Sequence, residues 1–392
     1  MRRALVLLGV LLMAYPAIAL EKVTLQQLQA RLDSAHKRSD KQIAALLSDV
    51  ALTERLSTPS LDRISATLPG DKSRMALLAI ADASAFLAPP AADIASDPPP
   101  EPKIQGEILT RAVQFVGEET ERLPNFLASR RTTRFQDTKN VPYANIPQYF
   151  TPGVFHFLDR NAAQVRYIGW VEAEEEQRWG GSHGPPHWVT EDPESEATFR
   201  PSRMGLTTRG IFGPLLLAVM HDIVESKVGW SRWELGAAGK LAVLRFSIDE
   251  NDSTYYVKWC CFQRPGGGMS EFESVPPYYG EIAIEAESGK VVRLSVMAEL
   301  DKDAPLTRAG IVVEYGPALI GGKSYFLPLK AISTTVGTAT HVANWVQADY
   351  EVLKQIDKYP VTAVNDMRFE HYQVFRGELR IVPEPVTPAP AQ

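Results

Sequence analysis

The sequence is poor in cysteine: Cys260 and Cys261 are the two in 392 residues. This excludes a disulfide scaffold and a cysteine-rich metal cluster. A basic excess is also missing, because 41 Lys and Arg stand against 47 Asp and Glu, for a formal net charge of −6. A nucleic-acid-binding surface normally needs such an excess, so no nucleic-acid partner is predicted. No apolar run reaches the roughly 20 residues that span a bilayer, so no transmembrane span is predicted either.

The standard catalytic signatures are absent as well. The sequence holds no GxSxG, HExxH, Walker or GxGxxG pattern. His221 and Asp222 are the nearest approach to a base with its orienting carboxylate. Adjacent residues on a helix point about 100° apart, so these two are predicted not to pair, and His221 is interpreted as a favourable charge at a helix C-terminus. We therefore predict no catalytic residue, no cofactor and no metal, and an enzyme is the least favoured class of function.

The first 19 residues have the pattern of a secretory signal. Arg2 and Arg3 precede an apolar stretch over 4–14, and Ala17 to Ala19 forms a small-x-small cleavage site. The alternative, an uncleaved anchor helix, is disfavoured because the stretch is short and Pro16 breaks it. The pattern predicts a periplasmic or secreted protein that begins near Leu20.

The chain after the signal divides by composition and period. Residues 20–87 have apolar side chains at helical spacing, with possible capping boxes at Thr24/Gln27 and Ser39/Gln42, and predict a module of four short helices. Residues 88–103 hold six prolines and predict a stiff linker. Residues 104–382 predict one helix, over 104–121, followed by a β domain, and the proline-rich residues 383–392 predict a disordered tail.

Alternation of apolar and polar residues predicts the strands of the β domain. Short turns at Glu287–Lys290 and at Gly321–Gly322 predict antiparallel hairpins, and no crossover helices separate the strands. The predicted fold class is α+β: a helical module followed by a strongly curved, half-barrel-like antiparallel sheet. The expected strands are 126–135, 164–172, 241–248, 254–262, 280–286, 291–300, 309–315, 323–335 and 367–381.

One apolar segment, Gly210 to Met220, interrupts the strand pattern. Eleven residues are too few to cross a membrane, so the segment is predicted to be a helix that lies on the concave face of the sheet. It is interpreted either as a lid over a ligand cavity or as a plug that fills a solid core. In both cases the predicted contact residues are Ile211, Phe212, Leu215, Leu216 and Val219.

Several blocks of the sequence resemble a group of uncharacterised secreted bacterial proteins. By strand pattern, the sheet region of that group is similar to the outer-membrane lipoprotein carrier (LolA-like) fold, a half-barrel closed by a helical lid. The resemblance implies this fold, but it carries no catalytic motif and therefore no activity. The blocks are 123–126, 130–135, 208–216, 280–294, 313–317, 321–328 and 365–375.

Two functions are compatible with these features. The first is a non-enzymatic binder of an apolar or acyl ligand, such as a lipid or a lipoprotein acyl chain, in the exported compartment. The second is a cell-envelope interaction or assembly protein that contacts a protein partner through the helical module. A cavity lined by the sheet would favour the first, and a specific partner of the module would favour the second.

Overall fold

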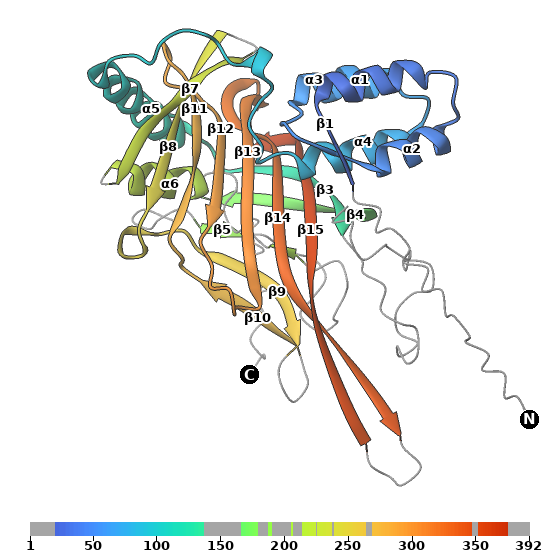
Figure 1. Cartoon of the computed structure of the whole chain (residues 1–392). Coiled ribbons are helices and arrows are strands. Elements are labelled where there is room, and N and C mark those ends of the chain that lie inside the picture. The colour runs from blue at the N-terminus through green and yellow to red at the C-terminus, as the bar shows by residue number, and fades with distance from the viewer. Residues whose placement is uncertain are drawn as a thin grey trace, which may run out of the picture.

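A computed structural model describes residues 20–136, 166–178, 187–189, 205–206, 214–224, 226–236, 239–263, 269–346 and 352–374. The predicted signal (1–19) and tail (383–392) lie outside the described residues. The protein is α+β: helices at the N-terminal end of the chain lie beside a large antiparallel sheet (Figure 1). This agrees with the predicted class at the level of mixed helices and antiparallel strands.

The helical unit, which we define as residues 20–87, contains the four predicted helices. Both predicted capping boxes are present: Thr24 and Gln27 cap the first helix, and Ser39 and Gln42 cap the second. A short parallel pair of strands, β1 (Glu21–Val23) and β2 (Val50–Leu52), was not predicted, because three residues are too few to show a period. The helices are α1 (Leu25–Ser34), α2 (Asp40–Ser48), α3 (Thr58–Thr67) and α4 (Asp71–Ala83).

The main sheet has ten strands, and every pair of neighbours is antiparallel. Their order across the sheet is β5-β4-β3-β15-β14-β13-β12-β11-β8-β7. The hairpin between β13 and β14 turns at Gly321 and Gly322, whose φ angles of 57° and 82° suit glycine. The strands are β3 (Phe126–Gln136), β4 (Arg166–Arg178), β5 (His187–Val189), β7 (Lys227–Gly236), β8 (Gly239–Ile248), β11 (Tyr278–Glu285), β12 (Val291–Ala298), β13 (Leu306–Ile320), β14 (Lys323–Val346) and β15 (Val352–Val374).

Several strands differ from the prediction. β5, β7 and the short strands at Gly205–Leu206 and Met269–Ser274 were not predicted, and β14, expected over 323–335, continues to Val346. β7 was missed because a bulge between Trp230 and Arg232 breaks its alternation. β15 was expected at 367–381 but spans Val352–Val374. The first part of β15 contains Pro360, and proline is disfavoured in a central strand. Pairing of β15 with β3 begins only at Ala363, so Pro360 lies where β15 is an edge strand that pairs with β14 alone among the described strands.

The predicted strong curvature is a further correction, because the sheet is open and not strongly curled. Its end strands β5 and β7 do not pair with each other. The proline-rich segment occupies the outer edge of β7: Ile94 bridges Glu234, and the Ala95 amide donates to the Trp233 carbonyl at 3.2 Å. The sequence predicted this segment to be a linker between two parts. In the structure it covers part of the exposed edge of β7, an edge that a closed barrel would not have.

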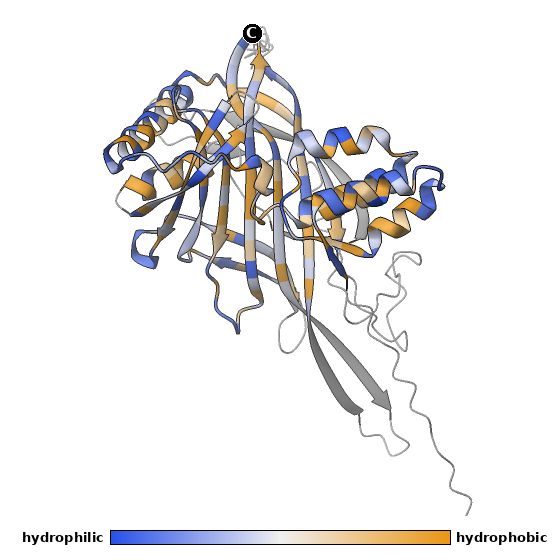
Figure 2. Cartoon of the chain, turned by 45° about the horizontal axis from the view of Figure 1, so that its top comes forward, coloured by the Kyte–Doolittle hydropathy of each residue, from blue (hydrophilic) through white to orange (hydrophobic). Residues whose placement is uncertain are grey.

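Each face of the sheet has its own cover. The inner face, as we call it, carries α5 (Pro102–Arg122), α6 (Pro214–Val224) and a small sheet of β6 (Gly205–Leu206), β9 (Val257–Gln263) and β10 (Met269–Ser274). The outer face carries the helical unit, which packs through α4. On β13, Ile311 and Val313 belong to the inner core while Val312 belongs to the outer one. This period of two is visible as alternating hydropathy along the strands (Figure 2).

Buried polar contacts fasten the helical unit to the outer face. Arg55 pairs with Glu234 of β7, and the Thr58 hydroxyl donates to Glu314 of β13 at 2.7 Å. Lys330 of β14 lies 3.1 Å from Asp82 of α4. Groups such as these are costly to bury without a partner, so the unit is held in one position on the sheet.

Candidate functional site

The predicted site residues lie on the inner face, where the structure describes three of the five. Leu215 and Val219 are buried in the inner core, with exposed fractions of 5% and 0%. Leu216 is half-buried and packs against the same core. Ile211 and Phe212 lie outside the described residues.

The helix that carries these residues is displaced from the prediction. It was expected over 210–220, but α6 spans Pro214–Val224. Proline is favourable in the first turn of a helix because its missing N–H has no intrahelical acceptor there, so Pro214 suits the start. The shift brings His221 and Asp222 into the last turn of the helix, where they contribute to its attachment.

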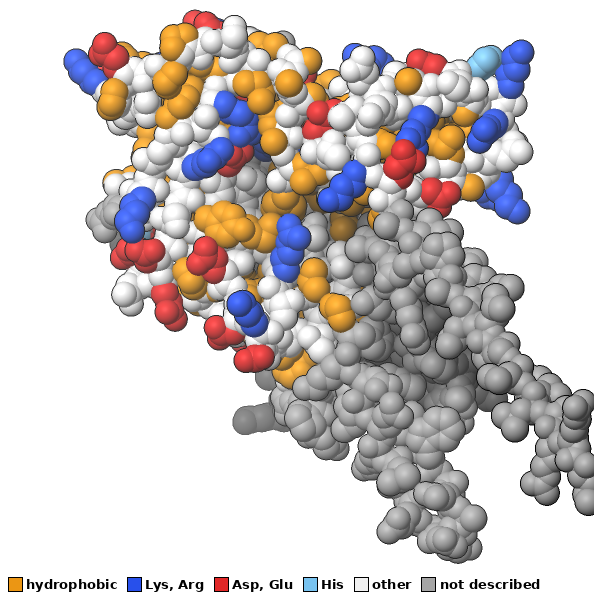
Figure 3. Space-filling view, viewed as in Figure 1, with side chains coloured by type: hydrophobic (Ala, Val, Ile, Leu, Met, Phe, Trp, Pro, Cys, Tyr) orange, Lys and Arg blue, Asp and Glu red, His pale blue; other side chains and the backbone are white. Residues whose placement is uncertain are grey.

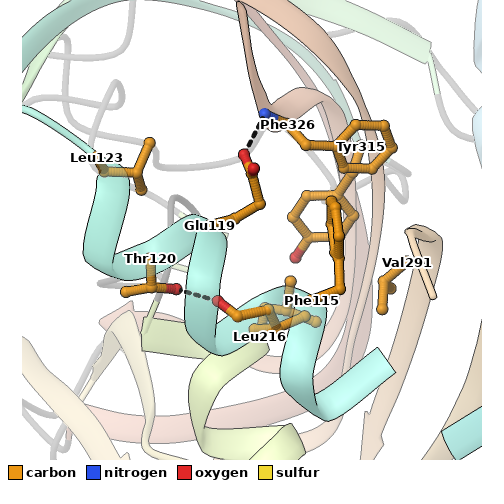
Figure 4. Close-up of a pocket in the computed structure, with 9 residues that line it drawn as sticks. Phe115, Glu119, Thr120, Leu123, Leu216, Val291, Tyr315 and Phe326 are labelled. Atoms are coloured by element: carbon orange, nitrogen blue, oxygen red, sulfur yellow. Dashed lines mark hydrogen bonds between the residues drawn. The ribbon is translucent and has the colours of Figure 1, made fainter. Parts of the chain in front are cut away.

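Leu216 lines a cavity of about 30 Å³ between α5, α6 and the β13–β14 hairpin (Figure 4). A space of that size holds one or two water molecules. It is far smaller than a typical ligand pocket, so this cavity holds no apolar ligand in the present conformation. The lining residues are Phe115, Val116, Glu119, Thr120, Leu123, Leu216, Val291, Tyr315 and Phe326.

Two of the three polar groups around this cavity are already engaged. Glu119 accepts a hydrogen bond from the Phe326 amide at 3.1 Å and pairs with Arg122. The Thr120 hydroxyl donates to the Val116 carbonyl one turn earlier, at 2.7 Å. The bond from the Phe326 amide to Glu119 holds α5 against the hairpin, and both polar side chains are already hydrogen-bonded.

The third polar group, the Tyr315 hydroxyl, has no hydrogen-bond partner within the described part of the chain. Tyr315 points inward from β13 and is 7% exposed, and its ring faces the cavity (Figure 4). Burial raises the pKa of this phenol well above its usual value, so the hydroxyl keeps its proton at neutral pH. A buried donor without an acceptor costs on the order of 1–3 kcal/mol, and an acceptor on a bound molecule would recover that cost.

The C-terminal end of α6 is firmly attached through Asp222. Its buried carboxylate accepts hydrogen bonds from the Thr254 amide and the Tyr278 hydroxyl, both at 2.8 Å. His221 also reaches it, with Nδ1 3.1 Å from Oδ1. The prediction that these two adjacent residues do not pair was therefore wrong, because the exposed imidazole of His221 turns toward the Asp222 carboxylate.

The N-terminal end of α6 is attached differently. Among the described residues no polar contact joins its first turn, Pro214 to Leu217, to α5 or to the sheet. Within the described lining, the contact of this turn with the cavity is the apolar side chain of Leu216. Apolar contacts are less directional than the hydrogen bonds to Asp222. Movement of the first turn should therefore cost less stabilising free energy than movement of the C-terminal end of the helix.

The described lining of this cavity offers contacts that suit binding of an apolar group. The nine lining residues include no His, Cys or Ser, and the carboxylate of Glu119 is engaged. Within the described ranges no three His, Cys, Asp or Glu side chains gather so as to hold a metal ion. None of the described helices has the length and apolar character needed to cross a membrane.

Comparisons with known proteins add little to this geometry. No protein-family model matches the chain, and no curated protein is similar to it at a significant level. A crystal structure of a LolA superfamily protein from Nitrosomonas europaea is similar over 70% of this chain and 94% of that one, at 9% identity and a TM-score of 0.22. A score this low carries no argument about function, so the function is inferred from the residues of this chain.

Sequence reasoning missed the polar end of the site. Tyr315, Glu119 and Phe326 were not among the predicted contacts, although Tyr315 continues the inward period of Ile311 and Val313. A polar hydroxyl at an inward position of a buried strand was the available signal. That α5 and the hairpin would meet around it depends on the tertiary structure.

Proposed function

We propose that the protein binds the apolar chain of an amphiphile, such as an acyl chain, between α5 and α6 on the inner face of the sheet. The observation that carries the proposal is the Tyr315 hydroxyl, which has no partner among the described residues and lies at a cavity whose other two polar side chains, Glu119 and Thr120, are already hydrogen-bonded. Such a pairing of apolar walls with one free donor suits a ligand that joins a hydrocarbon chain to a carbonyl or carboxyl oxygen.

The cavity of about 30 Å³ represents a closed form. An acyl chain enters when the first turn of α6 moves away from α5, while the Asp222 network keeps the other end of the helix in place. Leu216 then acts as part of a lid, and Leu215 and Val219 remain in the core. The lid and plug interpretations thus describe two ends of the same helix.

Titration of the delipidated protein with a fluorescent C18 fatty acid tests the proposal. Leu216→Trp fills the cavity and should weaken binding at least tenfold, whereas Leu319→Trp, at a position 67% exposed near the end of β13, should leave it unchanged. Tyr315→Phe removes one hydrogen bond, worth about tenfold for the fatty acid but nothing for an alkyl probe without an oxygen acceptor. No binding by the unmodified protein, together with no acyl species extracted from it, would refute the proposal.

We further propose that the protein acts in the periplasm or outside the cell. The pattern of a charged start, an apolar stretch and a small-x-small site in the first 19 residues supports export. The mass of the exported form should correspond to a chain that begins at or near Leu20. An exported form that retains Met1 would contradict cleavage.

A further inference from the structure

We propose that the far end of the helical unit is a docking surface for an anionic phospholipid bilayer. Its centre is a groove of about 320 Å³ between α1 and α2. The groove combines small or apolar side chains with two guanidinium groups, those of Arg31 and Arg38. The residues that line it are Ala30, Arg31, Ser34, Ala35, Arg38 and Leu46.

Basic side chains gather around this groove, at the end of the unit that is farthest from the sheet (Figure 3). Lys37, Arg38 and Lys41 are exposed, and none of them makes an ion pair within the part of the chain that the structure describes. Arg31 differs, because its guanidinium is paired with Glu21. Three exposed cations without an ion pair among the described residues therefore surround the α1–α2 turn.

The acidic side chains nearby are occupied in other contacts. The Asp40 carboxylate accepts hydrogen bonds from the backbone amides of Ser73 and Lys72, at 2.8 and 3.1 Å, where α4 begins. Asp33 accepts from the Gln29 side chain at 2.9 Å. Neutral amides hold these two carboxylates in place, so neither forms an ion pair with Lys37, Arg38 or Lys41, and the side chains around the turn keep a small positive excess of three cations over two anions.

The side chains around the groove favour a bilayer over an acidic protein as the partner of this surface. The basic side chains are long, exposed and unpaired, which suits many interchangeable phosphates better than one fixed set of carboxylates. The alanine and leucine side chains of the groove offer contact to the glycerol region of a lipid. Since the whole chain carries a net charge of −6, an anionic surface attracts this end and repels most of the rest, which orients the molecule.

Flotation of the delipidated full chain with vesicles of phosphatidylglycerol and phosphatidylethanolamine tests the inference without any apolar ligand. Each basic residue near an anionic surface contributes about fivefold to binding, so the double variant Lys37→Glu/Arg38→Glu should bind at least about 25-fold more weakly. The matched control is Lys302→Glu/Lys323→Glu, which changes the net charge equally at exposed positions of two sheet turns and should bind as the unmodified protein does. Binding should also fall steeply between 50 and 300 mM salt.

Three outcomes would overturn the inference: no flotation of the unmodified protein at 50 mM salt, equal loss in the control variant, or no loss in the double variant. Capture by immobilised polyglutamate without flotation would also overturn it, because the surface would then be a protein-docking site. Fatty-acid binding by the double variant should stay unchanged, so failure of this inference is distinguishable from failure of the proposed ligand site.

Discussion

Replacing Asp82 by Asn should make the protein more stable at high pH and remove much of the pH dependence of its unfolding free energy. Asp82 is fully buried where α4 meets the sheet, with the Lys330 ammonium 3.1 Å away. The same ammonium lies 3.1 Å from Asp366, which has a second cation, Arg368, at 3.4 Å. Two buried carboxylates thus share one lysine, and Asp82 is the one without further compensation.

The sign of the effect follows from the two protonation equilibria. Burial, and then the charge of Asp366, raise the pKa of Asp82 to about 8, against the opposite influence of Lys330. In the unfolded chain the pKa of an aspartate is about 3.9, so between roughly pH 4 and 8 the folded state binds one more proton. The unfolding free energy therefore falls by about 1.4 kcal/mol for each pH unit as the pH rises through this window. The full stabilisation from this group is present below about pH 4 and is lost above about pH 8.

Asn resembles the protonated carboxyl in shape and charge, so the variant should lack this slope. Urea unfolding at pH 5, 6, 7 and 8 measures it: the difference between variant and unmodified protein should grow in favour of the variant by about 1.4 kcal/mol per pH unit. Asp62→Asn, at an exposed position of α3, is the control and should follow the unmodified protein at every pH. Parallel curves for Asp82→Asn and the unmodified protein would show that Asp82 is ionised throughout, and would refute the argument.

Three further substitutions test the packing around the candidate site. Gly289→Ala places a methyl group 2.5 Å from the Arg111 carbonyl at a residue with a φ of 74°. It should lower the unfolding free energy by about 2 kcal/mol or more and loosen α5. An unchanged denaturation midpoint would contradict this contact. Gly117→Ala, inside α5 with no heavy atom within 4 Å of the new methyl group, should instead raise the unfolding free energy by about 0.5–1 kcal/mol, and a lower value than that of the unmodified protein would contradict the open space at this position. Tyr278→Phe removes a donor from the buried Asp222 carboxylate and should cost about 1.5–3 kcal/mol, and a loss below 0.5 kcal/mol in urea unfolding would mean that the network does not anchor α6.

Local features of the chain were predictable because short-range physics decides them. The capping boxes at Thr24 and Ser39 depend on residues three positions apart, and both form. The turn at Gly321–Gly322 follows from glycine's tolerance of positive φ. The period of two placed most strands of the sheet, and the short turns between them predicted the antiparallel class.

Where local signals conflict, the prediction failed. The bulge in β7 hides its alternation, and Pro360 hides the first part of β15. Adjacent side chains such as His221 and Asp222 were expected to diverge, but the flexible imidazole reaches back to a carboxylate that Thr254 and Tyr278 have fixed. Each of these outcomes depends on a neighbour that is distant in the sequence.

By itself, the sequence determined a helical unit and an antiparallel sheet, with an apolar helix packed on it. Only the tertiary structure decided that the sheet stays open, with its edge covered by the segment around Ile94. It also decided that α5 and α6 enclose the unpartnered Tyr315 hydroxyl, and that Asp82 and Asp366 share Lys330. The physical reason is that periods and caps record what a residue does to its near neighbours, whereas burial and electrostatic coupling arise between residues that meet only in the folded chain.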